Sequence, residues 1–569
     1  MLISTLDGPR RPVARTRFAT WISRPIVYIP ALILIPLIIL PMLFLLYGTF
    51  QSAPPGQHGS WTGQNYDVLW TGGFLTLVMN SLILVASSTA IALVVGGALA
   101  LALTRWNVPA ARFFDSVTLI PAYIPAFVGA IAWSFLLSPT SGYLNTAFKA
   151  IGLPTVNIYS WFGVIGVTSL YSIPLVYLYL RPALLSVDRS LEEAGRMLGA
   201  GQAKVTRTIL FPLIRPAIFS AALVVFVHTL SEFAVVGVLG VQAHINVISL
   251  RIVQLTTSGP VDPGRAAVLG VVLAAVSIFG LTVVVRGVGK NSFVTIGARH
   301  NADAPSNRGA ASYLGLVLCI VYALVTVVLP VAVLVIGSLQ PYLSTTFSSG
   351  WTFNNYVLMA NYPGALTSIG NSLMLSVLAA VGCALFSLIL AYIVVRRRGR
   401  LGAFVNYVSS APLAVPHMVF AVALIWMWVG TPFGLYGTKW ILLVAYIALL
   451  LPYSMRAAVT AFQQLDPVLE EAGRMSGASR ARVGLRIITP LVLPGVIAGG
   501  TIVLYHAMQE ISASLILYSA GQPVIPVAIW GLVSNGQYAQ LFALSVVYVA
   551  MIFALVAGVG WFGRRFARL

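Results

Sequence analysis

Long apolar runs, most of them near 20 residues, recur along the whole chain and are separated by short polar segments. About 20 consecutive apolar residues are enough for one helix to cross the hydrocarbon core of a bilayer. The pattern therefore predicts an all-α integral membrane protein with about 12 transmembrane helices. We expect these helices near residues 27–48, 76–103, 114–137, 161–180, 217–241, 265–285, 312–338, 370–395, 403–428, 440–459, 495–519 and 540–562.

One segment of the chain is repeated. Asp188 to Pro216 reads DRSLEEAGRMLGAGQAKVTRTILFPLIRP, Asp466 to Pro494 reads DPVLEEAGRMSGASRARVGLRIITPLVLP, and 16 of these 29 positions are identical at an offset of 278. Fainter matches extend the repeat, and they comprise Trp61-Thr62 with Trp351-Thr352, Asn65-Tyr66 with Asn355-Tyr356, Asn80-Ser81-Leu82 with Asn371-Ser372-Leu373, and Pro121 and Pro125 with Pro412 and Pro416. Each copy holds six predicted helices, an even number, so both copies keep one orientation and are related by a pseudo-twofold axis along the membrane normal.

The repeat divides the chain into four parts. We expect a basic cytoplasmic tail at 1–25, a first six-helix half at 26–286, a polar cytoplasmic linker at 287–311, and a second six-helix half at 312–569. The repeated segments fall in two long cytoplasmic loops, 181–216 and 460–494.

Composition supports the membrane assignment. The chain is 59% hydrophobic and 8% charged, with a mean hydropathy of +0.93, which leaves too little charge to cover a soluble surface. The net charge of +20 suggests nucleic acid as a partner, but its distribution argues against one. With the N-terminus inside, all but four of the 33 Lys and Arg residues lie on the cytoplasmic side, the exceptions being Lys149, Arg251, Arg265 and Lys439. This positive-inside bias predicts that both termini are cytoplasmic.

The repeated loops have the features of short amphipathic helices. Asp188 stands where a side chain can cap a helix start, and two glutamates in the first turn suit the helix dipole. Gly199 can end the helix. A loop that stays alike in both halves predicts that both copies dock on the same partner, and a symmetric partner with two equivalent sites fits best.

The motif E-E-A-x-x-x-G, followed after nine residues by a proline-marked entry into a membrane helix, resembles the EAA loop of permease subunits in binding-protein-dependent (type I) ABC importers. The resemblance implies that the loop forms a coupling helix seated in a groove of an ATPase subunit. The matching residues are Glu192, Glu193, Ala194 and Gly199 in the first copy and Glu470, Glu471, Ala472 and Gly477 in the second. Gly195 and Gly473 depart from the family, which commonly has Ala there.

The resemblance also implies partners and location. We expect an ATP-binding cassette subunit, as a homodimer, a solute-binding protein outside, the lipid bilayer of the bacterial inner membrane, and no nucleic acid. The segment from Gly287 to Ser292 lacks P-loop spacing, so this chain should hold no cofactor, and ATP with Mg²⁺ should bind the partner ATPase. No catalytic residues are predicted.

Two other classes of protein were weighed. A twelve-helix secondary transporter also has two parallel six-helix halves, but the loop from Thr104 to Asp115, TRWNVPAARFFD, does not match the Gly-Asp-Arg-Arg-rich loop of that family. A membrane enzyme is the other alternative, and the chain has neither HExxH nor GxSxG nor a cysteine cluster.

The fused double form resembles the iron(III)-type branch of these permeases, as does Ala132-Trp133 with Pro139, Gly142 and Asn145. Iron(III) is therefore the expected substrate. Thiamine, phosphonate or phosphate esters, and polyamines stay open as alternatives.

Two acidic residues fall deep in predicted membrane helices. Glu232 and Glu510 are 278 residues apart, and each follows a histidine four residues earlier, His228 and His506. A charge at the bilayer centre costs about 2.5–3.5 kcal/mol on insertion scales, so such residues usually face a cavity or a partner. We expect the two His–Glu pairs, each on one helix face, to line the translocation path near the pseudo-twofold axis. Hydrogen bonding between the halves is the alternative, and no metal site is firmly predicted.

Overall fold

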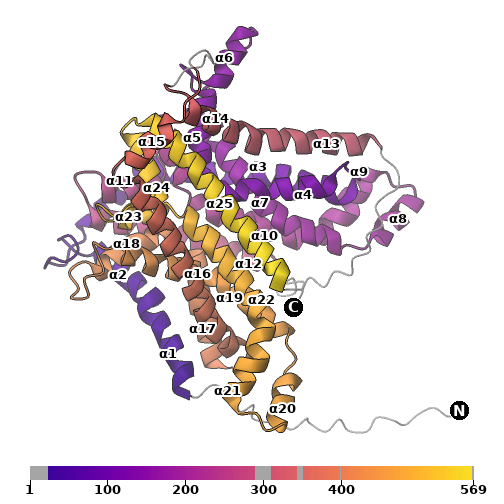
Figure 1. Cartoon of the computed structure of the whole chain (residues 1–569), viewed down its shortest axis with the longest axis vertical. Helices are drawn as coiled ribbons and strands as arrows, with labels where there is room; N and C mark the ends of the chain where they lie inside the picture. The colour runs from indigo at the N-terminus through magenta and orange to yellow at the C-terminus, as the bar shows by residue number, and fades with distance from the viewer. Residues whose placement is uncertain (1–23, 289–308, 343–349, 398, 567–569) are drawn as a thin grey trace.

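The computed structural model describes residues 24–288, 309–342, 350–397 and 399–566. The described residues form helices and connecting segments, drawn in Figure 1. Ten of the helical segments are long and apolar enough to cross a membrane, and two bent helix pairs bring the number to 12 if each pair is one span. The expected count of about 12 is therefore confirmed, with the tail (1–25) and the linker (287–311) lying almost wholly outside the described residues.

The first half begins with one long apolar span and ends with another. Its elements are α1 (Arg24–Leu34), η1 (Ile35–Ile39), α2 (Leu40–Thr49), η2 (Gln64–Leu69), α3 (Phe74–Arg105), α4 (Ala111–Tyr123), α5 (Ala126–Leu137), α6 (Tyr143–Ala150), α7 (Trp161–Ser186), α8 (Arg189–Met197), α9 (Gln202–Val205), η3 (Thr206–Leu210), α10 (Phe211–Leu230), η4 (Val236–Gly240), α11 (Ile248–Thr257) and α12 (Pro263–Val288).

The second half follows the same order. Its elements are α13 (Ala310–Ala323), η5 (Leu324–Val328), α14 (Leu329–Leu339), α15 (Asn354–Asn361), α16 (Ala365–Arg396), α17 (Arg400–Ser410), η7 (Ala411–Ala414), α18 (His417–Trp428), α19 (Trp440–Gln464), α20 (Val468–Met475), α21 (Arg480–Val483), η8 (Gly484–Ile488), α22 (Thr489–Gln509), α23 (Ser512–Leu517), α24 (Ile525–Ser534) and α25 (Tyr538–Phe566). The helix α6 has no named counterpart between α18 and α19.

Matched polar contacts explain why the fainter parts of the repeat are alike. The Asn65 amide donates to the carbonyls of Thr49 and Gln51 at the end of the first span, and Asn355 does the same to Ser338 and Gln340. These two side chains satisfy carbonyls that the helix end leaves without a partner.

The Asn-Ser motifs of α3 and α16 also make equivalent bonds. The amides of Asn80 and Asn371 donate to the carbonyls of Asn246 and Pro523. The hydroxyls of Ser81 and Ser372 accept the backbone N–H groups that begin α11 and α24. Each half therefore anchors the short helix before its last span on its second long helix.

The first span of each half packs against the other half. The helix α2 lies against α18 as well as α12, and α14 lies against α5 as well as α25. The fit between α2 and α18 is close, because a Cβ at Gly48 on α2 would come within 2.4 Å of the Trp426 ring. The two halves are thus interlocked by their first spans.

The third predicted span of each half is bent. The expected helix 114–137 is α4 and α5, which meet at 95°, and the expected helix 403–428 is α17 with η7 and α18, which meet at 110°. Pro125 and Pro416 lie at the breaks with extended ψ values of 128° and 137°. Proline lacks the N–H that would continue the helix and restricts the residue before it, so both spans turn at this point.

The fifth predicted span of each half is shorter at its C-terminal end than expected. We predicted helices over 217–241 and 495–519, but α10 ends at Leu230 and α22 at Gln509. Glu232 and Glu510 therefore follow the helix ends, and the expectation that each shares a helix face with its histidine was wrong. Each carboxylate accepts backbone N–H groups just downstream, which favours a local turn over a continued helix.

Candidate functional site

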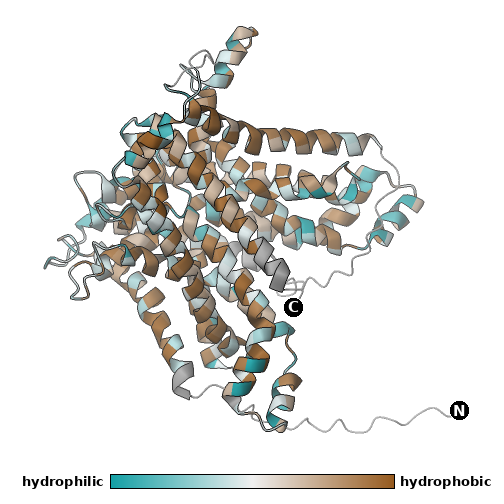
Figure 2. Cartoon of the chain, viewed as in Figure 1, coloured by the Kyte–Doolittle hydropathy of each residue, from teal (hydrophilic) through white to brown (hydrophobic). Residues whose placement is uncertain are grey.

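The two repeated loops form short helices outside the long apolar spans. In Figure 1 α8 and α20 lie at the far ends of two groups of helices that diverge from one another. Figure 2 shows hydrophilic residues gathered on both short helices, in contrast to the apolar spans behind them. The structure therefore places the matched sequence at two separate, polar ends of the molecule.

Both short helices start and end as the sequence predicts. The Asp188 carboxylate accepts the N–H of Ser190 at the start of α8, and Asp466 accepts that of Val468 before α20. The backbone bond lowers the pKa of Asp188 below its ordinary value, because it stabilises the ionised form. Gly199 and Gly477 both have φ of +81° just past the helices, a conformation that glycine adopts without strain.

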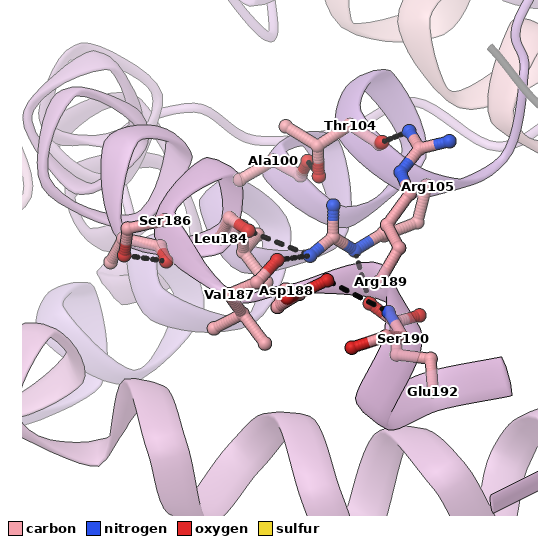
Figure 3. Close-up of polar contacts among 11 residues, drawn as sticks. Ala100, Thr104, Arg105, Leu184, Ser186, Val187, Asp188, Arg189, Ser190 and Glu192 are labelled. Atoms are coloured by element: carbon pink, nitrogen blue, oxygen red, sulfur yellow. Dashed lines mark hydrogen bonds and ion pairs between the residues drawn. The ribbon is translucent and has the colours of Figure 1, made fainter. Parts of the chain in front are cut away.

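The first glutamate of the first loop points inward and is bonded to the end of α3 (Figure 3). The Arg105 Nε lies 2.7 Å from Glu192 Oε1, and both side chains are 5% exposed. The same guanidinium donates to the carbonyls of Leu184 and Val187 at the end of α7. One arginine therefore ties the loop helix to two membrane helices.

The second loop has the same arrangement at equivalent positions. The Arg396 Nε lies 2.7 Å from Glu470 Oε1, and its Nη2 donates to the Leu465 carbonyl at the end of α19. The side chains are 12% and 18% exposed, so this pair is more open than the first. We name each of these two arrangements, Arg105–Glu192 and Arg396–Glu470, an arginine brace. Neither arginine was predicted from the sequence, although both occupy matching ends of helices of equal length.

Close packing explains the glycines that replace the usual alanine. A Cβ at Gly195 would lie 2.8 Å from the Ile209 side chain, and a Cβ at Gly473 would lie 2.7 Å from Ile487. Each loop helix is therefore pressed against the helix that follows it. The brace and this contact together hold the loop helix on two sides.

The remaining face of each loop helix is exposed. Glu193 and Ala194 on α8, like Glu471 and Ala472 on α20, point to solvent. Met197 and Leu198 are 88% and 89% exposed, and Met475 is 90% exposed. Large apolar side chains gathered on an exposed helix face mark an interaction surface. Of the predicted coupling residues, the first glutamate of each pair is thus internal, and the second, with the alanine, is available to a partner.

Glu232 and Glu510 cap the turns at which their helices end. Glu232 Oε1 accepts the N–H groups of Ala234 and Val235, and Glu510 Oε1 accepts that of Ala513. The carbonyls of the same two residues accept the hydroxyls of Ser249 and Ser514. Both residues therefore organise a break in the fifth span of their half.

The structure brings the four predicted pathway groups together and adds a fifth. His228 interacts electrostatically with Glu232 and Glu510, and His506 with His228 and Glu510. The fifth group is His417 at the start of α18, whose Nδ1 lies 2.5 Å from Glu510 Oε2. No sequence signal pointed to His417, because its equivalent in the first half, after Pro125, is Ala126.

Within the part of the chain that the structure describes, no three His, Cys, Asp or Glu side chains are placed to hold a metal ion. The cluster is therefore a set of paired polar groups in an apolar surrounding, built at two helix breaks. Such groups can bond one another across the halves, or contact a solute that passes between them.

Comparison with known proteins gives one family. The family described as "Binding-protein-dependent transport system inner membrane component" matches residues 92–290 and again residues 384–568. Each match contains one of the two loop helices with its membrane helices, so the repeat seen in the sequence corresponds to two copies of one family domain.

Several relatives match most of the chain, and three of them are described below. The "Ferric transport system permease protein FbpB" of Actinobacillus pleuropneumoniae is 28% identical and aligns over 87% of this chain and 72% of its own length. The "Probable ABC transporter permease protein y4fN" of Sinorhizobium fredii is 28% identical over 84% of each. The "Fe(3+)-transport system permease protein FbpB 2" of Haemophilus influenzae is 25% identical over 84% and 88%.

Proposed function

The chain belongs to the family of binding-protein-dependent transport system inner membrane components, and we propose that it forms the whole membrane path of an ATP-driven importer of iron(III). It is a multi-pass transport subunit with two fused permease halves. Fusion supplies both halves of the path in one chain, in a fixed ratio and orientation.

One observation carries this proposal. The two loop helices, α8 and α20, are held by equivalent arginine braces and present the same exposed residues at the ends of the two halves. A pair of equivalent docking helices suits a partner with twofold symmetry. A homodimeric ATPase that closes on ATP would pull both helices at once, and each brace would pass the movement to two membrane helices.

The other partners follow from the same reasoning. The chain has no P-loop spacing, so ATP and Mg²⁺ would bind the ATPase subunits, and a solute-binding protein would deliver the substrate on the outer side. The charge distribution supports an inner-membrane location with both termini in the cytoplasm. A cysteine placed at Asn301 that reacts with an impermeant reagent in intact cells would overturn this orientation, and one placed at Gln57 should react.

The substrate is proposed from the relatives. Two of the three relatives described above are named for ferric or Fe(3+) transport. A path that carries two carboxylates suits iron(III), which is a hard cation and prefers oxygen ligands. A passage without a closed ligand set also suits transport, because tight binding would prevent release.

Uptake in cells that depend on this chain for iron tests the proposal. Cells with the wild-type chain should accumulate labelled iron(III), and cells in which Glu193 and Glu471 are both changed to Arg should not, because the exposed docking face is then charge-reversed. The double variant should still insert, since neither side chain is buried, but it should no longer co-purify the ATPase. Equal iron uptake with and without the chain would refute the substrate, and unchanged ATPase co-purification would refute the docking face.

A further inference from the structure

The carboxylates of Glu232 and Glu510 differ in their hydrogen bonds. Both oxygens of Glu510 are bonded to the protein, Oε1 by the Ala513 N–H and Oε2 by His417, and the residue is 8% exposed. Glu232 uses Oε1 for backbone N–H groups in the same way. Its Oε2 accepts no hydrogen bond from any residue that the structure describes, and the side chain is only partly buried.

The two carboxylates differ in their hydrogen bonds because one position of the repeat holds different residues in the two halves. His417 and Ala126 each follow the proline at which the third span bends, and the prolines have nearly equal backbone angles. The two positions are therefore equivalent in the fold. An imidazole at one position reaches the carboxylate of its half, whereas a methyl group at the other cannot bond to Glu232.

The histidines of the two halves also differ in their contacts, and again the second-half residue has the closer partners. The ring of His506 lies close to those of Tyr453 and Tyr505, with centroids 4.7 Å and 4.3 Å away. Val227 occupies the place of Tyr505 in the first half, and His228 is exposed. The second half therefore engages its histidine and glutamate in close contacts with its own residues, whereas in the first half the histidine is exposed and one carboxylate oxygen accepts no hydrogen bond from the described residues.

We propose that His228 and Glu232 form the cargo-contacting site of the path, and that the His417 ring occupies, in the second half, the place that a cationic group of the cargo takes beside Glu232. This inference rests on the proposed transport of a cation and names the residues that meet it. The second-half pair, Glu510 with His417, is then a positioning element that fixes the break between α22 and α23.

The chemistry of the site fits a passing cation. A carboxylate oxygen without a protein partner attracts a hard cation strongly in a low-dielectric surrounding, and the backbone N–H groups on its other oxygen hold it in place. One carboxylate and one imidazole are too few ligands for tight binding of a metal ion. The site would therefore attract the cargo without retaining it.

Terbium(III), a hard trivalent cation whose luminescence is sensitised by nearby Tyr and Trp, is a direct probe of the purified full-length chain. Wild-type protein should bind Tb³⁺ within the membrane domain, and Glu232→Gln should weaken that binding at least tenfold. Glu510→Gln should weaken it less than twofold. Asp67→Asn, which removes an exposed acid between the first two long spans, is the matched control for surface binding and should leave the signal unchanged. Equal losses in the two intramembrane variants, or no loss in Glu232→Gln, would overturn the assignment.

Exchange of the residues that differ between the halves gives a reciprocal test. Ala126→His should supply an internal partner to Glu232 and abolish Tb³⁺ binding without removing the carboxylate. His417→Ala should free the second carboxylate and create a second binding step. A second step that fails to develop in correctly folded His417→Ala protein would contradict the proposed equivalence of the two positions. Folding is checked by the monodisperse elution and helical content of each variant.

Iron uptake separates this inference from the proposed function. If wild-type cells import iron and Glu232→Gln cells import at least tenfold less with normal ATPase co-purification, both stand. If wild-type cells import no iron while Tb³⁺ binding still depends on Glu232, the iron assignment fails and the cation site stands. If iron import is normal in Glu232→Gln cells, the proposed function stands and the site is refuted.

Discussion

The arginine brace of the first loop makes a sharp prediction about coupling. Glu192→Gln removes the charge that faces Arg105 but keeps the size of the side chain and one possible acceptor. Glu193→Gln changes the neighbouring residue, which is exposed, and is the matched control for effects inside the chain. We expect Glu192→Gln to loosen α8 from α3 and α7, and Glu193→Gln to leave this attachment intact.

The size of the effect follows from burial. Arg105 and Glu192 are each 5% exposed, and removing one partner of such a buried pair costs about 3–5 kcal/mol because the other charge stays buried and unpaired. Glutamine keeps part of the hydrogen bond, so about 1.5–3 kcal/mol is expected, the range for a hydrogen bond to a charged group. About 2.8 kcal/mol corresponds to a hundredfold shift in the equilibrium between the held and released loop helix. The more exposed Arg396–Glu470 pair should lose less.

The assay is the number of ATP molecules hydrolysed per substrate imported in proteoliposomes that contain the assembled transporter. Glu192→Gln should raise this ratio, because the ATPase still docks on the exposed face but moves the membrane helices less effectively. The charge exchange Arg105→Glu with Glu192→Arg should recover part of the coupling. An unchanged ratio in Glu192→Gln would show that the brace does not transmit movement.

Other parts of the structure give three further predictions. Gly199→Val places a β-branched residue at φ of +81°, which costs about 1–2 kcal/mol, and it should reduce ATPase co-purification while insertion stays normal. Gly48→Ala forces a methyl group against the Trp426 ring and should cost about 1–3 kcal/mol, seen as a lower Tm in detergent, whereas Gly97→Ala meets only an atom at 3.6 Å and should not lower it. The pKa of Asp188 is depressed in the folded chain, so its cap is fully present above its ordinary pKa of 3.8 and is lost as the pH falls through the lower folded value. Amide exchange in α8 should therefore accelerate only below about pH 4, and Asp188→Ala should remove this pH dependence.

The membrane spans and the repeat were predictable from the sequence, whereas the points at which the spans bend or end early were not. Apolar length indicated the spans, and the matched 29-residue segments indicated the repeat and the loop helices, since both signals are local. Pro125 and Pro416, at which the third spans bend, are present in the sequence as matching prolines. The residues on both sides of each proline are apolar, so they were predicted to form one continuous helix. A hydropathy pattern reports how apolar a segment is and does not report a change in the direction of the helix axis.

The candidate site was predictable to the extent that the repeat marked it. Glu232 and Glu510 were found because they are acidic, intramembrane and symmetric. His417 was not predicted, because the equivalent position in the first half is Ala126. A comparison of the two halves that looks for identical residues does not identify a position at which they differ. Arg105 and Arg396 could have been found, since both stand at the last position of a 32-residue helix, but a basic residue at a cytoplasmic helix end is already explained by topology.

The interlocked first spans have a consequence for biosynthesis. The surface of α18 that covers α2 lies in residues 417–428, which leave the ribosome long after α2 has entered the bilayer. Until then lipid must cover the face of α2 that later contacts Trp426. Gly48 on that face has no side chain of its own. The helix α2 is thus inserted well before α18, one of its final neighbours, has been synthesised.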